Sequence, residues 1–254
     1  MTVTTAPPEY WNRHYEQQNL VYEEEGIPFR ELFDRFMPRG GNCFEVGCYP
    51  GPFSIYLAKR FGYRVNGIDT TPHVSTHLPS HLREHNVDVG ELIQGDFFEY
   101  EAERTFDVVC SFGFIEHFED YKHAIERHLN LLADNGTLVI STPNFRNIQY
   151  FLHRWLDAEN LDRHVVAAMS LKEWRKQLET SGLKVLWQGY YRTADFWWES
   201  SGTSLRLQHK RLMVRRVLQA LDRRVSLPNR WLSPYMITFA KRVSEDDRHE
   251  KKRC

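Results

Sequence analysis

The chain has 254 residues, of which 41% are hydrophobic and 14% aromatic, so it can bury a substantial core and does not belong to the disordered class. Its formal net charge of -1 hides an asymmetry, because residues 205–254 carry 14 Lys and Arg against 5 Asp and Glu, which indicates that this end meets an anionic surface or polymer. The four cysteines show no paired spacing, and no apolar run approaches the roughly 18 residues of a membrane-spanning helix. We therefore predict a single domain in a reducing, cytoplasmic compartment.

An aromatic helix is expected near the N-terminus, after a frayed Thr/Pro tail over residues 1–8. Trp11 and Tyr15 are four residues apart, so they lie on one helix face and can pack on the domain. A second helix is expected from Pro28 to Met37, because a proline and two glycines follow it.

Residues 42–51 have the pattern of the first strand, turn and helix of a nucleotide-binding α/β unit. Gly47 lets the chain turn sharply and lets the backbone approach a ligand, which a side chain would prevent. Glu45, at the end of the strand, can hold a cationic or hydroxylated ligand. The turn reads G-x-Y-x-G, and Tyr49 stands where bare backbone would have to approach a pyrophosphate. We therefore do not expect NAD or FAD.

Acidic residues close the next two strands. Residues 63–69 form a strand that ends in Asp69, whose carboxylate can accept hydrogen bonds from ribose hydroxyls. Residues 87–94 form a third strand, which is followed by Gly95, Asp96 and Phe97.

Four histidines recur at every fourth residue between these strands, a spacing that can bind a metal ion on a helix. They are His73, His77, His81 and His85. Pro79 interrupts the helix and no carboxylate motif accompanies the histidines, so we predict a solvated helical face and no metal site in the chain.

Residues 106–113 are nearly all apolar, which predicts a central strand that is buried on both faces. The chain then runs into residues 114–120, which include His117. Ligands in open α/β sheets bind beyond the carboxyl ends of the strands, so we place His117 at the reaction centre.

The remaining elements complete an α/β pattern. A helix over 121–133 precedes a strand over 137–142, and Ser170 is a good N-cap for a helix over 171–180. Strands over 183–192 and 235–242 would pair antiparallel. Two longer segments, 144–170 and 193–234, are insertions between these elements. The pattern predicts a doubly wound sheet of seven strands.

The sequence E-V-G-C-Y-P-G at 45–51, the acid that closes the second strand and the run L-L-A-D-N-G-T-L-V-I-S-T-P-N at 131–144 resemble class I S-adenosylmethionine-dependent methyltransferases. The likeness is greatest to ubiquinone-type O-methyltransferases and deoxysugar methyltransferases. The usual family pattern is D/E-x-G-x-G-x-G, and Tyr49 replaces its middle glycine. The resemblance implies a Rossmann-like sheet with an antiparallel last strand, S-adenosylmethionine as cofactor, and a lid formed by residues 1–37.

The resemblance also implies site residues. An acid at the position of Asp96 receives the adenine amino group, and the apolar residue after it, Phe97, stacks on the ring. The full set of expected cofactor-binding residues is Tyr15, Glu45, Gly47, Cys48, Tyr49, Gly51, Asp69, Asp96, Phe97, Ser111 and Phe112. The insertion over 144–170 would shape the acceptor pocket.

Methyl transfer to a hydroxyl requires removal of a proton, and an imidazole suits that task near pH 7. His117 is the first candidate base and His164 the second; alternatively, His117 only packs the loop and touches the cofactor. No Ser/His/Asp order, C-x-x-C or P-loop lysine motif is present, which leaves hydrolase and kinase functions without residues to support them.

Three classes of function remain. We expect a methyltransferase acting on a sugar or similar polar small molecule, with O-methylation favoured over N-methylation and a glycan or lipid-linked precursor among the acceptors. The alternatives are an RNA methyltransferase, which we do not favour because no N-P-P-Y-like motif follows the fourth strand, and a non-catalytic module that binds the cofactor.

A basic helix is expected over residues 205–225. Its predicted apolar stripe consists of Leu207, Val214, Val217, Leu218, Leu221 and Val225. The predicted cationic surround consists of Lys210, Arg211, Arg215, Arg216, Arg223 and Arg224. Either this helix packs on the domain or on a second subunit of a homodimer, or it lies on an anionic membrane surface.

Overall fold

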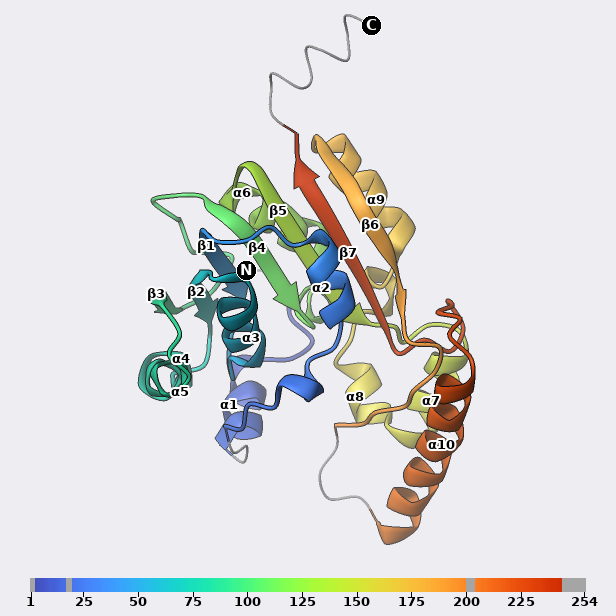
Figure 1. Ribbon diagram of the computed structural model, residues 1–254. Coiled ribbons are helices and arrows are strands. Elements are labelled where there is room, and N and C mark those ends of the chain that lie inside the picture. The colour runs from blue at the N-terminus through green and yellow to red at the C-terminus, as the bar shows by residue number, and fades with distance from the viewer. Residues whose placement is uncertain (1–2, 17–19, 200–203, 244–254) are drawn as a thin grey trace, which may run out of the picture.

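Seven strands form one sheet in the order β3-β2-β1-β4-β5-β7-β6, as the computed structural model shows (Figure 1). The strands are β1 (Asn42–Val46), β2 (Arg64–Asp69), β3 (Val89–Gln94), β4 (Phe106–Phe112), β5 (Leu132–Pro143), β6 (Leu183–Tyr191) and β7 (Tyr235–Arg242). Strands β1 to β5 run parallel to one another, whereas β7 is antiparallel to both β5 and β6. The predicted fold class is confirmed. The structure describes residues 3–16, 20–199 and 204–243.

Helices cover both faces of the sheet, as its buried strands require. One face carries α2 (Arg30–Phe36), α3 (Pro52–Phe61), α4 (His73–Thr76) and α5 (Leu78–Glu84). The other carries α6 (Tyr121–Leu131) and α9 (Leu171–Thr180). The remaining helices are α1 (Pro8–Glu16), α7 (Ile148–Leu156), α8 (Ala158–Asp162) and α10 (Leu205–Arg224). Three short 3-10 turns lie at Glu24–Gly26, Ile115–His117 and Val166–Ala168.

Local capping sets the bounds of several helices. The Ser170 hydroxyl accepts a hydrogen bond from the Glu173 amide at 3.5 Å, so α9 begins where the sequence predicts. Helix α2 begins later than predicted, because Phe29 has a left-handed backbone with φ of 67° and ends the preceding loop.

Residues 3–8 are ordered, contrary to the predicted frayed tail. The Thr5 amide donates to the carbonyl of His117 at 2.8 Å, and Thr4 forms an antiparallel bridge with Phe118. The prediction of a frayed tail failed because Thr4 and Thr5 pair with Phe118 and His117, which lie more than a hundred residues further along the chain. The charged segment after Ser244, which includes Cys254, lies outside the described residues.

Helix α10 forms as predicted, but the side that it packs against the domain is not the predicted apolar stripe. Val217 and Leu221 are 64% and 37% exposed, whereas Arg211 is buried. Arg211 donates to the carbonyl of Leu156 at 2.6 Å and to the carboxylate of Asp157 at 3.2 Å. The helix therefore docks on α7 and α8 through a buried ion pair, and its apolar stripe is only partly covered.

In the part of the chain that the structure describes, no helix is long and apolar enough to span a bilayer.

Candidate cofactor and acceptor site

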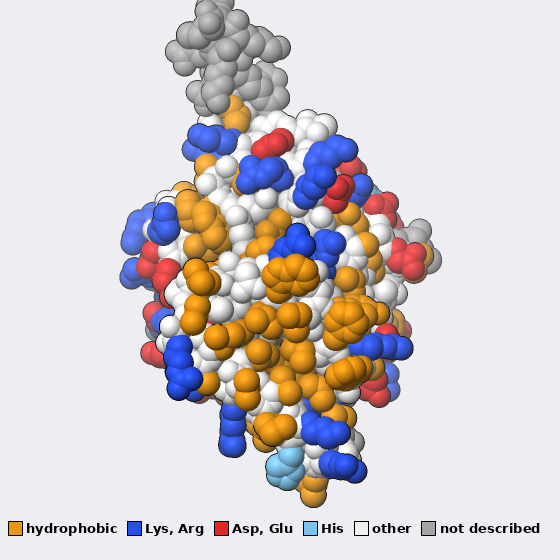
Figure 2. Space-filling model, turned by 90° about the vertical axis from the view of Figure 1, so that its right-hand side faces the viewer, with side chains coloured by type: hydrophobic (Ala, Val, Ile, Leu, Met, Phe, Trp, Pro, Cys, Tyr) orange, Lys and Arg blue, Asp and Glu red, His pale blue; other side chains and the backbone are white. Residues whose placement is uncertain are grey.

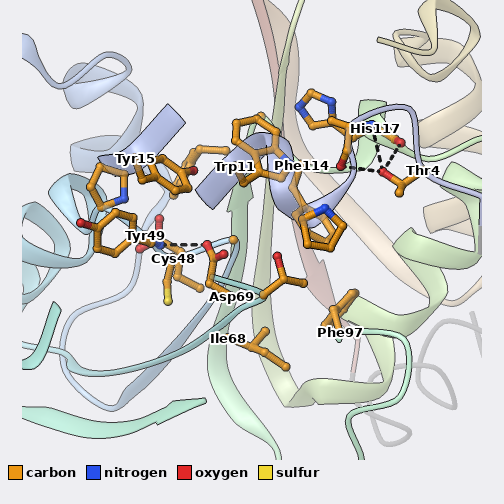
Figure 3. A pocket seen from close by; sticks show the side chains of 18 of the residues that line it. Thr4, Trp11, Tyr15, Cys48, Tyr49, Ile68, Asp69, Phe97, Phe114 and His117 are labelled. Carbon is orange, nitrogen blue, oxygen red and sulfur yellow. Dashed lines mark hydrogen bonds between the residues drawn. The ribbon is translucent and has the colours of Figure 1, made fainter. Parts of the chain in front are cut away.

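A cavity of about 370 Å³ lies at the carboxyl ends of β1, β2 and β4, where open α/β sheets bind ligands (Figure 3). Helix α1 and the loop before it close the cavity from the other side. Nine of the predicted cofactor-binding residues line it: Tyr15, Glu45, Gly47, Cys48, Tyr49, Asp69, Asp96, Phe97 and Phe112.

The turn after β1 brings the backbone close to the cavity. Gly47 has φ of 72°, and a Cβ at this position would lie 3.0 Å from the ring of Phe114, so a side chain would be strained and crowded. Glu45 is buried beside it and accepts a hydrogen bond from the Ser54 hydroxyl at 2.5 Å. Burial raises the pKa of Glu45 to about 8. A cationic ligand group beside it would favour the ionised carboxylate.

Asp69 is the acid at the end of β2. Its two carboxylate oxygens accept hydrogen bonds from the backbone amides of Tyr49 and Thr71, both at 3.1 Å. Burial raises its pKa to about 6 in spite of these bonds. Each oxygen keeps a further lone pair, so the carboxylate can accept hydrogen bonds from two vicinal hydroxyls, as a ribose offers.

The end of the cavity formed by the residues after β3 is apolar, with one acidic residue at its edge. Phe97 is buried and packs edge-to-face on Phe114 at 5.5 Å between ring centroids. Asp96 is exposed, and one carboxylate oxygen accepts the Phe98 amide at 2.8 Å. Asp96 and Phe97 thus both line this end of the cavity, and their implied roles toward an adenine ring stay predictions.

Two predicted residues do not line the cavity. Gly51 has φ of 94°, and a Cβ there would lie 2.5 Å from Leu78, so this glycine allows α3 to pack against α5. Ser111 is fully buried within β4.

The resemblance implied an N-terminal lid over residues 1–37, but among its residues only Tyr15 was expected to bind the cofactor. Thr4, Ala6, Trp11 and His14 line the cavity together with Tyr15, whose ring packs edge-to-face on Tyr49 at 4.8 Å. The aromatic spacing of α1 was the available signal, whereas nothing in residues 3–8 marked them as part of a site.

A second cavity of about 350 Å³ adjoins the first. Five residues line both cavities: Trp11, Phe53, Phe112, Gly113 and His117. His164 lines the second cavity only, and its ring centroid lies 4.6 Å from that of His117. The structure thus brings the two predicted catalytic histidines together.

Both histidines are held by backbone carbonyls. The Nδ1 atom of His117 lies 2.8 Å from the carbonyl oxygen of Arg163, and the Nδ1 atom of His164 lies 2.6 Å from that of Asn160. Because a carbonyl oxygen only accepts, each Nδ1 carries the hydrogen and each Nε2 keeps its lone pair. Burial lowers the pKa of His117 to about 4 and the pKa of His164 well below its usual value. His117 is therefore a weaker base than the sequence suggested.

A family model described as a methyltransferase domain matches residues 22–188, more than half of the chain. The chain belongs to this methyltransferase family. S-Adenosylmethionine is the cofactor of the family, and the cavity lined by Gly47, Asp69 and Phe97 is the candidate site for it.

The methyltransferase is 30% identical over 135 residues to an uncharacterized methyltransferase of Mycobacterium tuberculosis, a match that covers 51% of this chain and 66% of that protein. It is 29% identical over 140 residues to a ubiquinone biosynthesis O-methyltransferase of Neisseria meningitidis, with coverage of 54% and 58%. The chain thus spans less than two thirds of these relatives.

A solved S-adenosylmethionine-dependent methyltransferase of Thiobacillus denitrificans, in complex with S-adenosyl-L-homocysteine, has a TM-score of 0.58 at 13% identity, with coverage of 94% of this chain and 99% of that one. This similarity shows that the two proteins share a fold.

Replacement of Asp69 tests the ribose contact. We expect Asp69→Ala to weaken S-adenosylhomocysteine binding by ~1–3 kcal/mol, because two ligand hydroxyls lose their acceptor. Calorimetric titration measures the loss, and Asp88→Ala, which removes an exposed carboxylate, is the matched control. Equal affinity of Asp69→Ala and wild type would exclude Asp69 from the contact.

Proposed function

We propose that this methyltransferase transfers a methyl group to a hydroxyl of a sugar or a similar polar small molecule, a glycan or lipid-linked precursor included. One observation carries the proposal. Of the five described residues that line both cavities, His117 is the one with a titratable side chain. A cofactor in the first cavity and an acceptor in the second would meet at His117, where the acceptor hydroxyl must be activated.

The lining of the second cavity supports a polar, ring-shaped acceptor. Phe29, Trp197 and Tyr235 supply aromatic walls, on which the apolar faces of a ring can pack. Thr142 and Glu199 add polar groups that can hydrogen-bond hydroxyls. A cavity of about 350 Å³ also suits a small molecule rather than a polymer chain.

Catalysis by this chain would consist mainly of positioning. S-Adenosylmethionine supplies a methyl carbon bonded to a cationic sulfur, which is attacked in line. Trp11, Phe112 and Gly113 form the boundary between the cavities and would fix the approach of the acceptor oxygen. Because burial keeps the pKa of His117 low, this imidazole needs a further group to activate a hydroxyl.

A screen with methyl-labelled cofactor tests the proposal. We expect label in hydroxyl-bearing sugars or related small molecules, with less or none in matched amines. Label in RNA would support the alternative of a nucleic-acid methyltransferase. Cofactor binding without transfer to any acceptor class would support a non-catalytic module and contradict the proposal.

We also propose that the enzyme works in the cytoplasm. Three cysteines in the described part of the chain, Cys43, Cys48 and Cys110, are free and buried, which fits a reducing compartment.

We further propose that the protein docks on an anionic lipid surface through one apolar face, which runs over α7 and α10 (Figure 2). Phe151 and Trp155 on α7 are 61% and 80% exposed. The exposed large apolar side chains on which this face draws, from α7, α10 and the segment after α10, are Ile148, Tyr150, Phe151, Trp155, Leu205, Leu212, Met213, Val217, Leu221, Leu227 and Trp231. Tryptophan side chains such as Trp155 and Trp231 favour the boundary between headgroups and acyl chains.

The charges around the apolar face favour lipid over a second copy of the chain. Lys210, Arg216, Arg223 and Arg224 are exposed on α10. The single acid of this helix, Asp222, is paired with Arg192 at 3.0 Å. In a two-fold dimer built on this face the cations would meet their own copies, whereas anionic headgroups would neutralise them.

Vesicle sedimentation tests this surface. We expect the protein to pellet with vesicles containing phosphatidylserine and to be released by salt, because each cation near the surface contributes ~1 kcal/mol. The double variant Phe151→Ser and Trp155→Ser should lose binding, while Val21→Ser, which alters an exposed valine elsewhere, should not. Equal binding to neutral and anionic vesicles, or a dimer that Trp155→Ser dissociates without any vesicle binding, would refute docking on an anionic lipid surface.

A further inference from the structure

Three buried side chains at the second cavity lie close enough to share one ligand. Glu116 and His117 are consecutive residues of the 3-10 turn after β4, and His164 follows α8. One nitrogen of each imidazole and one oxygen of the Glu116 carboxylate all lie within 4.8 Å of one another. The Val165 amide donates to the Glu116 carbonyl at 2.7 Å, which ties the two segments together.

Both imidazoles are oriented as metal ligands usually are. A ligating histidine binds the metal through one ring nitrogen and donates from the other to a carbonyl or carboxylate, which fixes the tautomer and the ring plane. The carbonyls of Arg163 and Asn160 receive the Nδ1 hydrogens of His117 and His164. The two Nε2 lone pairs therefore remain as donors to a cation.

Glu116 supplies the independent observation that points to a ligand. Its side chain is completely buried, and neither carboxylate oxygen has a hydrogen-bond partner among the described residues. An unpartnered buried carboxyl group is costly, and it lines the same cavity as the two histidines. A bound cation would give both the charge and the lone pairs a partner.

We propose that Glu116, His117 and His164 bind a first-row divalent transition-metal cation, such as Zn²⁺. Two imidazoles and one carboxylate suit such a cation better than Mg²⁺ or Ca²⁺, which prefer oxygen ligands. Bonds of about 2.0–2.2 Å would draw the ligand atoms to roughly 3–3.5 Å apart, which small side-chain rotations can supply. The sequence prediction considered a metal motif along one helix only, whereas these candidate ligands come from two segments.

The proposed role of this cation rests on the proposed function. Three protein ligands leave coordination positions open toward the second cavity, as in catalytic metal sites. An acceptor hydroxyl bound there would have a lowered pKa and lose its proton to water. Its oxygen would then form the new bond to the methyl carbon while the carbon–sulfur bond breaks and the electron pair returns to sulfur. No electron is transferred to or from the cation.

Cobalt binding tests the site without relying on activity. The full chain, without a histidine tag and after chelator treatment, should bind one Co²⁺ with visible absorption bands, and Zn²⁺ should displace it. Glu116→Gln and His164→Gln should each weaken Co²⁺ binding by at least about 100-fold. The loss of a direct metal ligand should weaken binding more than the loss of a residue that only hydrogen-bonds to a ligand. The matched control is His128→Gln, since His128 is also fully buried with its Nδ1 atom 2.7 Å from a backbone carbonyl.

Two outcomes would overturn the metal site. One is a wild-type chain that binds no Co²⁺ or Zn²⁺. The other is binding that persists unchanged in both Glu116→Gln and His164→Gln, which would place the ion elsewhere, for example on the stacked pair His73 and His77. Circular dichroism of the variants verifies their fold. Calorimetry with S-adenosylhomocysteine distinguishes failure of the metal site from failure of the proposed methyltransferase function, because loss of the metal site alone leaves cofactor binding intact.

Discussion

His117→Ala should lower turnover by ~10²–10⁴ while the affinity for S-adenosylhomocysteine stays nearly the same. The imidazole lies where the two cavities meet, so its removal affects activation of the acceptor more than binding of the cofactor. The Thr5 amide contacts the backbone carbonyl of residue 117, and alanine preserves that contact.

Steady-state rates with the best acceptor from the labelled screen measure this effect. His77→Ala is the control, because His77 is exposed and lines neither cavity. A parallel loss of cofactor affinity in His117→Ala would show that the residue only packs the loop. An amine acceptor, which needs less activation, should show a much smaller loss of rate.

Arg211→Met should lower the free energy of unfolding by ~3–5 kcal/mol, because it leaves the buried Asp157 without its arginine. Both side chains are almost wholly inaccessible, and their ion pair at 3.2 Å joins α10 to the end of α7. The hydrogen bond from Arg211 to the Leu156 carbonyl is lost as well.

Denaturant unfolding measures this loss, and Arg154→Met is the matched control. Arg154 pairs with Asp162 at 3.2 Å, but both side chains are more than half exposed, so its removal should cost ~0–1 kcal/mol. The double variant Arg211→Met with Asp157→Leu should recover most of the stability, because an apolar pair can replace a buried ion pair. Equal losses in Arg211→Met and Arg154→Met would show that α10 is not anchored by this pair.

The sheet and the cofactor cavity could be predicted because their signals are local. Apolar runs predict the strands, and an acid such as Asp69 directly follows its strand, so the rule for parallel sheets places it at the cavity. The cap of α9 by Ser170 follows from an equally short pattern, whereas the antiparallel direction of β7 was implied by the resemblance to the methyltransferase family.

The rest depends on contacts between distant parts of the chain. The orientation of α10 is set by Asp157, which lies 54 residues before Arg211, and helical periodicity alone treats Arg211 as a surface residue. Residues 3–5 have no strand pattern of their own and are ordered by pairing with the loop at His117 and Phe118. Glu116 and His164 become neighbours only when the segment before α9 folds over that loop.

Titration of S-adenosylhomocysteine into the wild-type chain tests most directly that this cavity is a methyltransferase cofactor site. We expect one site per chain with a dissociation constant on the order of micromolar, equivalent to ~8 kcal/mol, that weakens in Asp69→Ala and is unchanged in Asp88→Ala. A folded wild-type chain that binds neither S-adenosylhomocysteine nor S-adenosylmethionine would contradict the account.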